Sequence, residues 1–292
     1  LCDYSFDATV QGNGCATLNI TPQRLSGAYA RLIWETGTQA NSVISSLGYD
    51  GSRIRFRTGT QQGNALIGLF DTWGECVWSW HIWVASYNPD SSAQTYASGA
   101  VFMDRNLGAI GTDYTQSAAC GLYYQWGRKD PMLPGVYLGT GTTAVDKSCY
   151  TDSDKTGYAF NKTGLTTNAI SEYIGNPHCF NTSTTMDELY YNLWSADNTQ
   201  TVANYDPIVK TVYDPSPVGY CVPQGTVFTG FSYNGASISS GGYGTQINSP
   251  YQSAGEFTAV RGFRFYCNRM NGEGVFDPNG GTVFFPATGY RS

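Results

Sequence analysis

Short runs rich in apolar residues, set off by Gly, Asn and Thr, recur through the first 88 residues, and in some of them apolar and polar positions alternate. Such runs predict β-strands, and they occupy residues 30–34, 43–47, 53–57, 65–70 and 77–84. In residues 53–57, Ile54 and Phe56 alternate with arginines, so one face of this strand is expected to be buried and the other wet. Residues 49–52 contain Asp-Gly, a hairpin signal. We therefore expect a small all-β, sandwich-like region over residues 1–88.

The run at residues 77–84 is the best predicted strand in the chain. Its even positions place Trp78, Trp80 and Ile82 on one face. We interpret this face as buried core rather than as an aromatic platform for sugars, because Trp and Ile on one face are typical of a core. His81 lies on the opposite face with no partner nearby in the sequence, so we expect a structural histidine rather than a catalyst.

Beyond residue 88 the alternation becomes weaker. Residues 88–92, Asn-Pro-Asp-Ser-Ser, form a turn-rich break that we take as the domain boundary, which gives domains at 1–88 and 89–292. The second domain shows signals for helices at 167–174 and 184–194 and for strands at 261–267 and 282–285. Long Gly/Ser/Tyr/Asn-rich loops fill the rest, so the predicted fold class is α+β with short helices.

Composition narrows the class of protein. Only 13% of the 292 residues are charged and the net charge is −6, which argues against a nucleic-acid-binding surface. No run of 18 apolar residues predicts a membrane-spanning segment. Aromatic residues make up 15% of the chain and include 22 Tyr, a content that is typical of exported binding proteins. Because the chain begins at Leu1, we expect either a removed leader or a piece of a longer polypeptide.

Eight cysteines are spread along the chain without a CxxC motif, so we do not expect a zinc site. They are either free buried thiols or form one to three disulfides. Because low charge and many Tyr favour an exported protein, we expect some disulfides. The first candidate pairs are Cys2 with Cys15 and Cys149 with Cys179.

One segment resembles the start of a calcium-binding loop. Asp152, Asp154 and Thr156 supply oxygen atoms at alternate positions, and Gly157 follows at the sharp turn. The twelfth position is Thr163, where such loops carry a bidentate Glu. A solvated turn is therefore the preferred interpretation, and no cofactor is expected beyond this calcium candidate.

The sequence offers little material for catalysis. His178 and Cys179 are adjacent, so their side chains are not expected to face each other, and no GxSxG motif occurs. For Arg105 and Arg128 we expect structural ion pairs with nearby carboxylates rather than catalytic roles. We predict no catalytic residues and no enzyme.

A series of motifs beyond residue 77 resembles a known family. The motifs, in order, are WSWHIW (78–83), MDRNLGA (103–109), GLYYQWGRKDP (121–131), YDPSPVGYCVP (213–223), FTGF (228–231), RGFRF (261–265) and FFPATGYR (284–291). The ordered set, over residues 77–291, is similar to that of Bacteroidetes fimbrial-tip and surface-adhesin proteins that carry the major paralogous domain. This resemblance implies a C-type-lectin-like fold related to the sulfatase-modifying factors. It supplies no catalytic residues that can be transferred to this chain. It also implies an extracellular location, on a fimbria attached to the outer membrane.

The predicted function is a non-enzymatic cell-surface adhesin or fimbrial-tip subunit that binds a host or bacterial glycan or surface protein. Other fimbrial subunits are further candidate partners. Contact would be made by long loops, above all residues 232–255, where Tyr233, Tyr243 and Tyr251 are the candidate ligand-binding residues. The alternatives are a receptor-binding protein of a phage tail and a structural subunit of a pilus or filament, in which sheet edges pair with a partner's strand.

Overall fold

The computed structural model describes residues 1–14, 22–95, 100–113, 116–132, 135–137, 144–146, 149–150, 169–181, 192–196, 207–224, 256–257, 261–266 and 282–286. The chain divides into two compact units, each assembled from several stretches of sequence. The first comprises Leu1–Ala85, Tyr123–Leu133 and Lys147–Pro223, and the second Ser86–Leu122, Pro134–Asp146 and Gln224–Ser292. Division into domains at 1–88 and 89–292 stays a prediction, because a compact unit need not fold independently.

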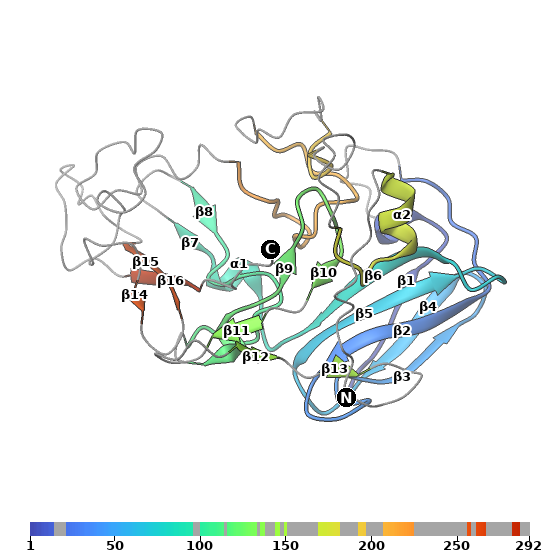
Figure 1. Ribbon diagram of the computed structural model, residues 1–292, viewed down its shortest axis with the longest axis horizontal. Helices are drawn as coiled ribbons and strands as arrows, with labels where there is room; N and C mark the ends of the chain where they lie inside the picture. Colours follow the sequence, from blue (N-terminus) through green and yellow to red (C-terminus); the bar gives the residue numbers. More distant parts are fainter. Residues whose placement is uncertain are drawn as a thin grey trace. The chain divides into compact units, whose positions relative to one another are not determined.

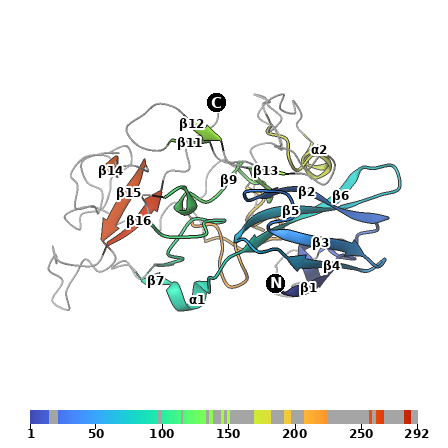
Figure 2. The same cartoon turned by 90° about the horizontal axis from the view of Figure 1, so that it is seen from below.

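Two antiparallel sheets form the centre of the first unit. One has the strand order β1-β4-β3 and contains Asp3–Asp7, Arg53–Thr58 and Ile44–Tyr49. The other has the order β13-β2-β5-β6 and contains Cys149–Tyr150, Tyr29–Thr36, Gly63–Phe70 and Cys76–Val84. The sheets lie face to face as two layers, with β2, β5 and β6 on one side and β1, β3 and β4 on the other (Figures 1 and 2).

The core of this unit lies between the two sheets. Its buried residues are Ala8, Leu32, Val43, Ile44, Ile54, Phe56, Ala65, Ile67, Leu69, Trp78, Trp80 and Val212. The even positions of β6 therefore face the core, as predicted, and so do Ile54 and Phe56 of β4, whose arginines stay at the surface. Period-two alternation places the apolar side chains on one face of each strand, and burial of that face holds the two layers together.

The predicted strands are confirmed to within a few residues, including those at 261–266 and 282–286. The Asp-Gly hairpin is confirmed as well, between β3 and β4. Asp50 Oδ1 accepts hydrogen bonds from the backbone N–H groups of Ser52 and Arg53, which stabilises the turn.

The remaining elements are short. The first unit also holds η1 (Gln11–Gly14), β9 (Tyr123–Tyr124), β10 (Pro131–Met132) and α2 (Ile170–Gly175). The second unit holds α1 (Pro89–Ser92), β7 (Gln94–Thr95), β8 (Val101–Phe102), η2 (Ser117–Ala119), β11 (Gly135–Tyr137), β12 (Ala144–Asp146), β14 (Glu256–Phe257), β15 (Arg261–Tyr266) and β16 (Thr282–Pro286). At the predicted break, Asn88 caps a single helical turn by accepting from the Asp90 N–H.

The predicted α+β class, with a C-type-lectin-like domain after residue 88, is wrong. The described chain is mostly β-sheet in small sheets, with 36% strand and 9% helix. The helix predicted at 167–174 is observed at Ile170–Gly175, with Ala169 as an N-cap that has no side-chain hydrogen bond; residues 167–168 lie outside the described residues. Residues 184–191 of the other predicted helix lie outside the described residues.

Candidate functional site

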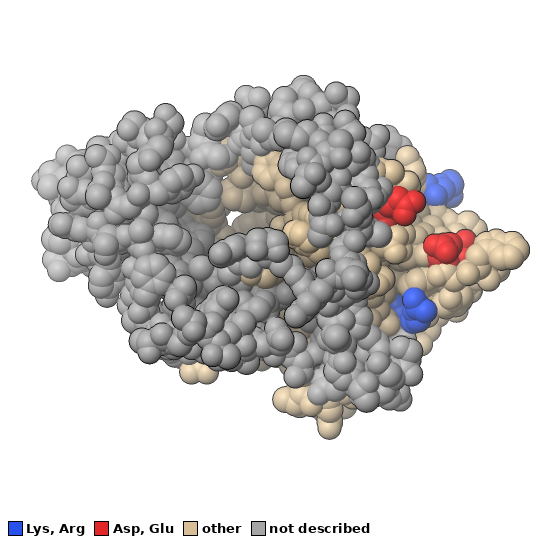
Figure 3. Space-filling view, in the orientation of Figure 1, with Lys and Arg blue, Asp and Glu red and all other residues tan. Residues whose placement is uncertain are grey.

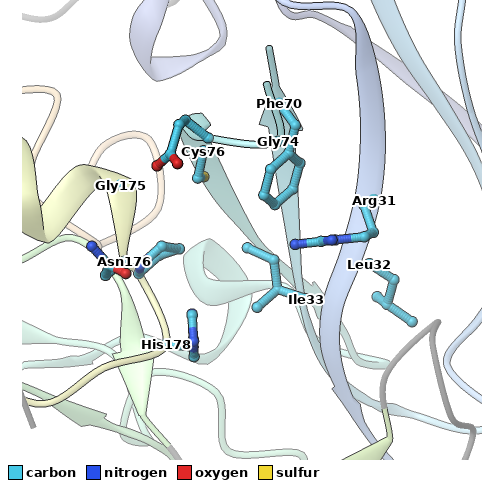
Figure 4. A pocket seen from close by; sticks show the side chains of 11 residues that line it. Arg31, Leu32, Ile33, Phe70, Gly74, Cys76, Gly175, Asn176 and His178 are labelled. Carbon is cyan, nitrogen blue, oxygen red and sulfur yellow. The ribbon is translucent and has the colours of Figure 1, made fainter. Parts of the chain in front are cut away.

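A surface groove of about 400 Å³ lies in the first unit, beside the outer face of the four-stranded sheet. Its lining residues come from β2, from the β5–β6 turn and from the segment after α2: Arg31, Leu32, Ile33, Phe70, Gly74, Glu75, Cys76, Gly175, Asn176, Pro177 and His178. Figure 4 shows the Arg31 side chain extending from β2 past the Phe70 ring, toward the side where Asn176 and His178 lie. The four-stranded sheet thus forms one wall of the groove, and the segment after α2 forms the other.

A stack of side chains across β2 and β5 supports the sheet wall. Tyr29 and Phe70 are opposite each other in the register, and their ring centroids lie 5.6 Å apart with 12° between the planes. The guanidinium carbon of Arg31 lies 4.1 Å from the Phe70 centroid. This arrangement depends on Gly68, where an added Cβ would come within 2.6 Å of Phe70 Cε2. Phe70 is therefore a rigid base that holds the Arg31 charge at the groove.

The β5–β6 turn presents an exposed tryptophan next to the groove. Asp71 Oδ1 accepts hydrogen bonds from the N–H groups of Trp73, at 2.8 Å, and Glu75, at 2.9 Å. Gly74 adopts a φ of 89°, in the left-handed region that favours glycine. The Trp73 side chain is not drawn into the core: the residue is 87% exposed. A fixed backbone thus holds a large aromatic surface in solvent.

Arg128 fixes the second wall. Its Nη1 donates to the carbonyl oxygen of Cys179 at 2.6 Å, and its Nη2 donates to that of Asn176 at 3.3 Å. The Arg128 carbonyl in turn accepts from Trp194 Nε1 at 3.0 Å. Arg128 was expected to pair with a carboxylate; it instead ties backbone carbonyls together across the segment that carries Asn176 and His178.

Two opposite charges line the groove and make no hydrogen bond or ion pair with the described part of the protein. They are the Arg31 guanidinium and the Glu75 carboxylate, and both residues are exposed. Several other described charges form ion pairs, for example Arg57 with Asp3 and Arg55 with Asp50. The groove therefore offers one cationic donor and one anionic acceptor to a ligand.

His178 adds an uncharged ring to the same wall. Burial lowers its pKa, and the nearby Arg31 and Arg128 lower it further, against the weaker opposing effect of Asp130. The imidazole is therefore neutral at neutral pH, with one donor and one acceptor nitrogen.

Behind the groove lies a buried cluster of polar residues that serves the fold. Lys129 Nζ donates to Ser79 Oγ at 2.5 Å and to Asp130 Oδ1 at 2.6 Å, and Ser79 Oγ also donates to Asp130 Oδ1. Burial lowers the pKa of Lys129, and the Asp130 carboxylate opposes this effect. The cluster joins β6 to the segment after β9, and its buried hydrogen bonds stabilise the unit.

The prediction for His81 is confirmed. Its Nε2 lies 3.0 Å from Asn64 Oδ1 and its Nδ1 lies 3.2 Å from the Tyr124 hydroxyl. An amide oxygen only accepts, so Nε2 carries the hydrogen and Nδ1 accepts from Tyr124. The predicted ion pair of Arg105 is also confirmed, with Asp104 at 2.8 Å.

Most residues singled out as candidate sites from the sequence lie outside the described residues. This holds for the ligand-binding candidates Tyr233, Tyr243 and Tyr251 and for the calcium candidates Asp152, Asp154 and Thr156. Cys2 is exposed and Cys179 is buried, but Cys15 and the Cys149 side chain lie outside the described set. Both disulfide pairs therefore stay predictions.

Sequence reasoning missed the groove. A signal for the turn was present, because Asp71 and Gly74 are typical turn residues that flank Trp73. Nothing in the sequence indicated that Arg31 and His178, separated by more than half of the chain, line the same groove.

Comparisons of the chain with protein families, with curated proteins and with solved structures find no match. Among the described residues, none of the helices has the length and apolar character needed to cross a membrane.

Proposed function

We propose that this protein is a non-enzymatic cell-surface adhesin or fimbrial-tip subunit, and that the groove beside Trp73 is a site at which it binds a glycan or protein. The observation that carries the proposal is the 87% exposed Trp73, whose backbone N–H is held by Asp71 and which directly precedes Gly74 and Glu75 in the lining of a groove of about 400 Å³. Tryptophan is among the residues that contribute most to binding energy at interfaces. A groove of this volume is within the range of small-molecule sites.

The use of buried titratable groups supports a binding role over an enzymatic one. Glu35 accepts hydrogen bonds from the backbone N–H groups of Val43 and Ile44, at 3.2 and 2.7 Å, and its pKa is raised by burial. Lys129 is likewise hydrogen-bonded to Ser79 of β6, and the His81–Asn64 hydrogen bond joins β6 to β5. These groups stabilise the first unit, whereas the groove offers exposed charges and an exposed aromatic ring.

The proposed location is extracellular, on an outer-membrane-attached fimbria, and the proposed partner is a host or bacterial glycan or surface protein. A net charge of −6 is unfavourable for binding to the phosphate backbone of nucleic acids. In the described part of the face that Figure 3 shows, acidic and basic side chains lie near one another among uncharged residues.

Binding of the labelled full chain to epithelial and bacterial cells tests the proposal. The Trp73→Ala variant is expected to bind at least about thirtyfold more weakly, the loss typical of a hot-spot residue. Its unfolding temperature should stay unchanged, because Trp73 is exposed. Tyr4→Ala is the matched control, since Tyr4 is a 52% exposed aromatic residue on the other sheet. Equal binding by wild type and Trp73→Ala would contradict the proposed site.

A structural filament subunit is the second candidate function. In the described part of the chain, β1 lies at one edge of the three-stranded sheet, where a strand from another subunit could pair. Concentration-dependent polymerisation of the purified chain, without cell binding, would favour this candidate.

A further inference from the structure

We propose that the groove beside Trp73 is a saccharide-binding site that recognises an uncharged sugar through two neighbouring hydroxyl groups, one hydrogen-bonded to Arg31 and the other to Glu75. The inference rests on the proposed binding function and names the ligand class of that site. Three features of the groove carry it: its paired opposite charges, its aromatic neighbour and its polar wall.

The charges set the chemistry of the ligand. The Arg31 guanidinium can only donate hydrogen bonds and the Glu75 carboxylate can only accept them, and neither forms a hydrogen bond or ion pair with the described residues. An ionic group on the ligand would be attracted by one of these residues and repelled by the other. A pair of neighbouring hydroxyls satisfies both, because one hydroxyl oxygen accepts from the guanidinium while the other O–H donates to the carboxylate. Such charge-assisted hydrogen bonds are stronger than bonds between neutral groups.

The aromatic neighbour suits the apolar face of a sugar ring. The π-face of an indole is electronegative, so it attracts the weakly positive C–H groups on one side of a pyranose. Trp73 belongs to the same five-residue turn as Glu75, and the hydrogen bonds of Asp71 fix both backbone N–H groups. Stacking and hydroxyl recognition are therefore held in one rigid segment.

The far wall keeps the groove neutral and polar. His178 is uncharged at neutral pH because burial and Arg31 lower its pKa, so the charges of Arg31 and Glu75 stay balanced. Asn176 and His178 give this wall polar side chains, which favours a hydroxyl-rich ligand over an apolar side chain of a protein.

A glycan array of neutral and acidic oligosaccharides, probed with the fluorescent full chain, tests the inference. Wild type is expected to bind neutral saccharides with vicinal hydroxyls. Arg31→Gln and Glu75→Gln should each lower affinity about tenfold or more, as expected for loss of a hydrogen bond to a charged group. Periodate, which cleaves vicinal diols, should abolish binding of the same saccharides. Tyr4→Ala should bind like wild type, and unchanged unfolding temperatures should show that the exposed Arg31 and Glu75 variants fold.

Absence of saccharide binding on the array would overturn the inference, as would binding of acidic sugars alone or binding unaffected by both substitutions. Cells treated with periodate or protease separate this inference from the proposed function. Cell adhesion that is lost after protease treatment but not after periodate treatment would overturn the inference of a saccharide ligand. The proposed adhesin function would be unaffected by that result. Saccharide binding on the array without adhesion to any cell would support the site and count against the adhesin.

Discussion

Lys129 and Asp130 are neighbours in sequence and form a buried ion pair, with Lys129 Nζ 2.6 Å from Asp130 Oδ1 and both side chains under one tenth exposed. The ammonium also lies 4.4 Å from the centroid of the Trp78 ring and donates to the carbonyl oxygen of Ser79 at 3.0 Å. Through these contacts the pair is joined to the centre of β6, which lies about fifty positions earlier in the chain. Its geometry makes the pair essential to the unit.

Removal of the carboxylate should destabilise the protein strongly. In Asp130→Ala, the Lys129 ammonium keeps its burial but loses its counter-charge, which is expected to cost about 3–5 kcal/mol of unfolding free energy. Urea unfolding at neutral pH measures this loss. The double variant Lys129→Met, Asp130→Ala should recover part of it, because no unpaired charge remains. A single variant as stable as wild type would contradict the role assigned to the pair.

His81 should make stability depend on pH. Burial lowers its pKa from 6.5 to about 3, so between these values the unfolded state binds a proton that the native state excludes. The unfolding free energy should therefore fall as the pH decreases below 6.5, by up to about 1.4 kcal/mol per pH unit from this residue. In His81→Gln the amide can still bond to Asn64 and Tyr124, but the slope should be lower by that amount. Identical slopes for both proteins would exclude His81 as the titrating group.

Arg128 should act on the groove indirectly, as a positioning residue. Arg128→Lys keeps a cation but cannot reach the carbonyl oxygens of both Cys179 and Asn176. We expect weaker ligand binding and a loss of about 1–3 kcal/mol in unfolding free energy. Arg105→Lys, in the second unit, is the matched control and should leave groove binding unchanged. Full binding by Arg128→Lys would show that the wall holds without this anchor.

Gly68→Ala should disturb the base of the groove. The new Cβ would lie 2.6 Å from Phe70 Cε2 and 3.0 Å from Ile33 Cδ1, so the Phe70 ring must move away from Arg31. We expect about 1–3 kcal/mol of destabilisation and weaker saccharide binding. Gly48→Ala provides a control, because nothing lies within 4 Å of a Cβ at that position of β3. Calorimetric unfolding and the array measure the two effects; similar behaviour of both variants would argue against a steric role for Gly68.

Local pattern accounts for the part of the fold that was predicted correctly. Alternation of Ile54 and Phe56 with arginines is enough to identify β4 and its buried face, because the side chains of a strand alternate whatever the strand pairs with. The Asp50 turn is equally local. The same reasoning gave helices too large a place in the fold class, because the described chain is mostly β-sheet and its helices are short.

The amino-acid sequence by itself thus determined where the main strands lie, which of their faces are buried and that His81 would be structural. Only the tertiary structure decided the groove. The β2–β5 register places Tyr29 opposite Phe70 and lets Arg31 reach that ring, and Arg128 holds His178 on the facing wall. The reason is physical: alternation is a property of neighbouring residues, whereas a binding site depends on sheet register and on contacts between segments far apart in the chain.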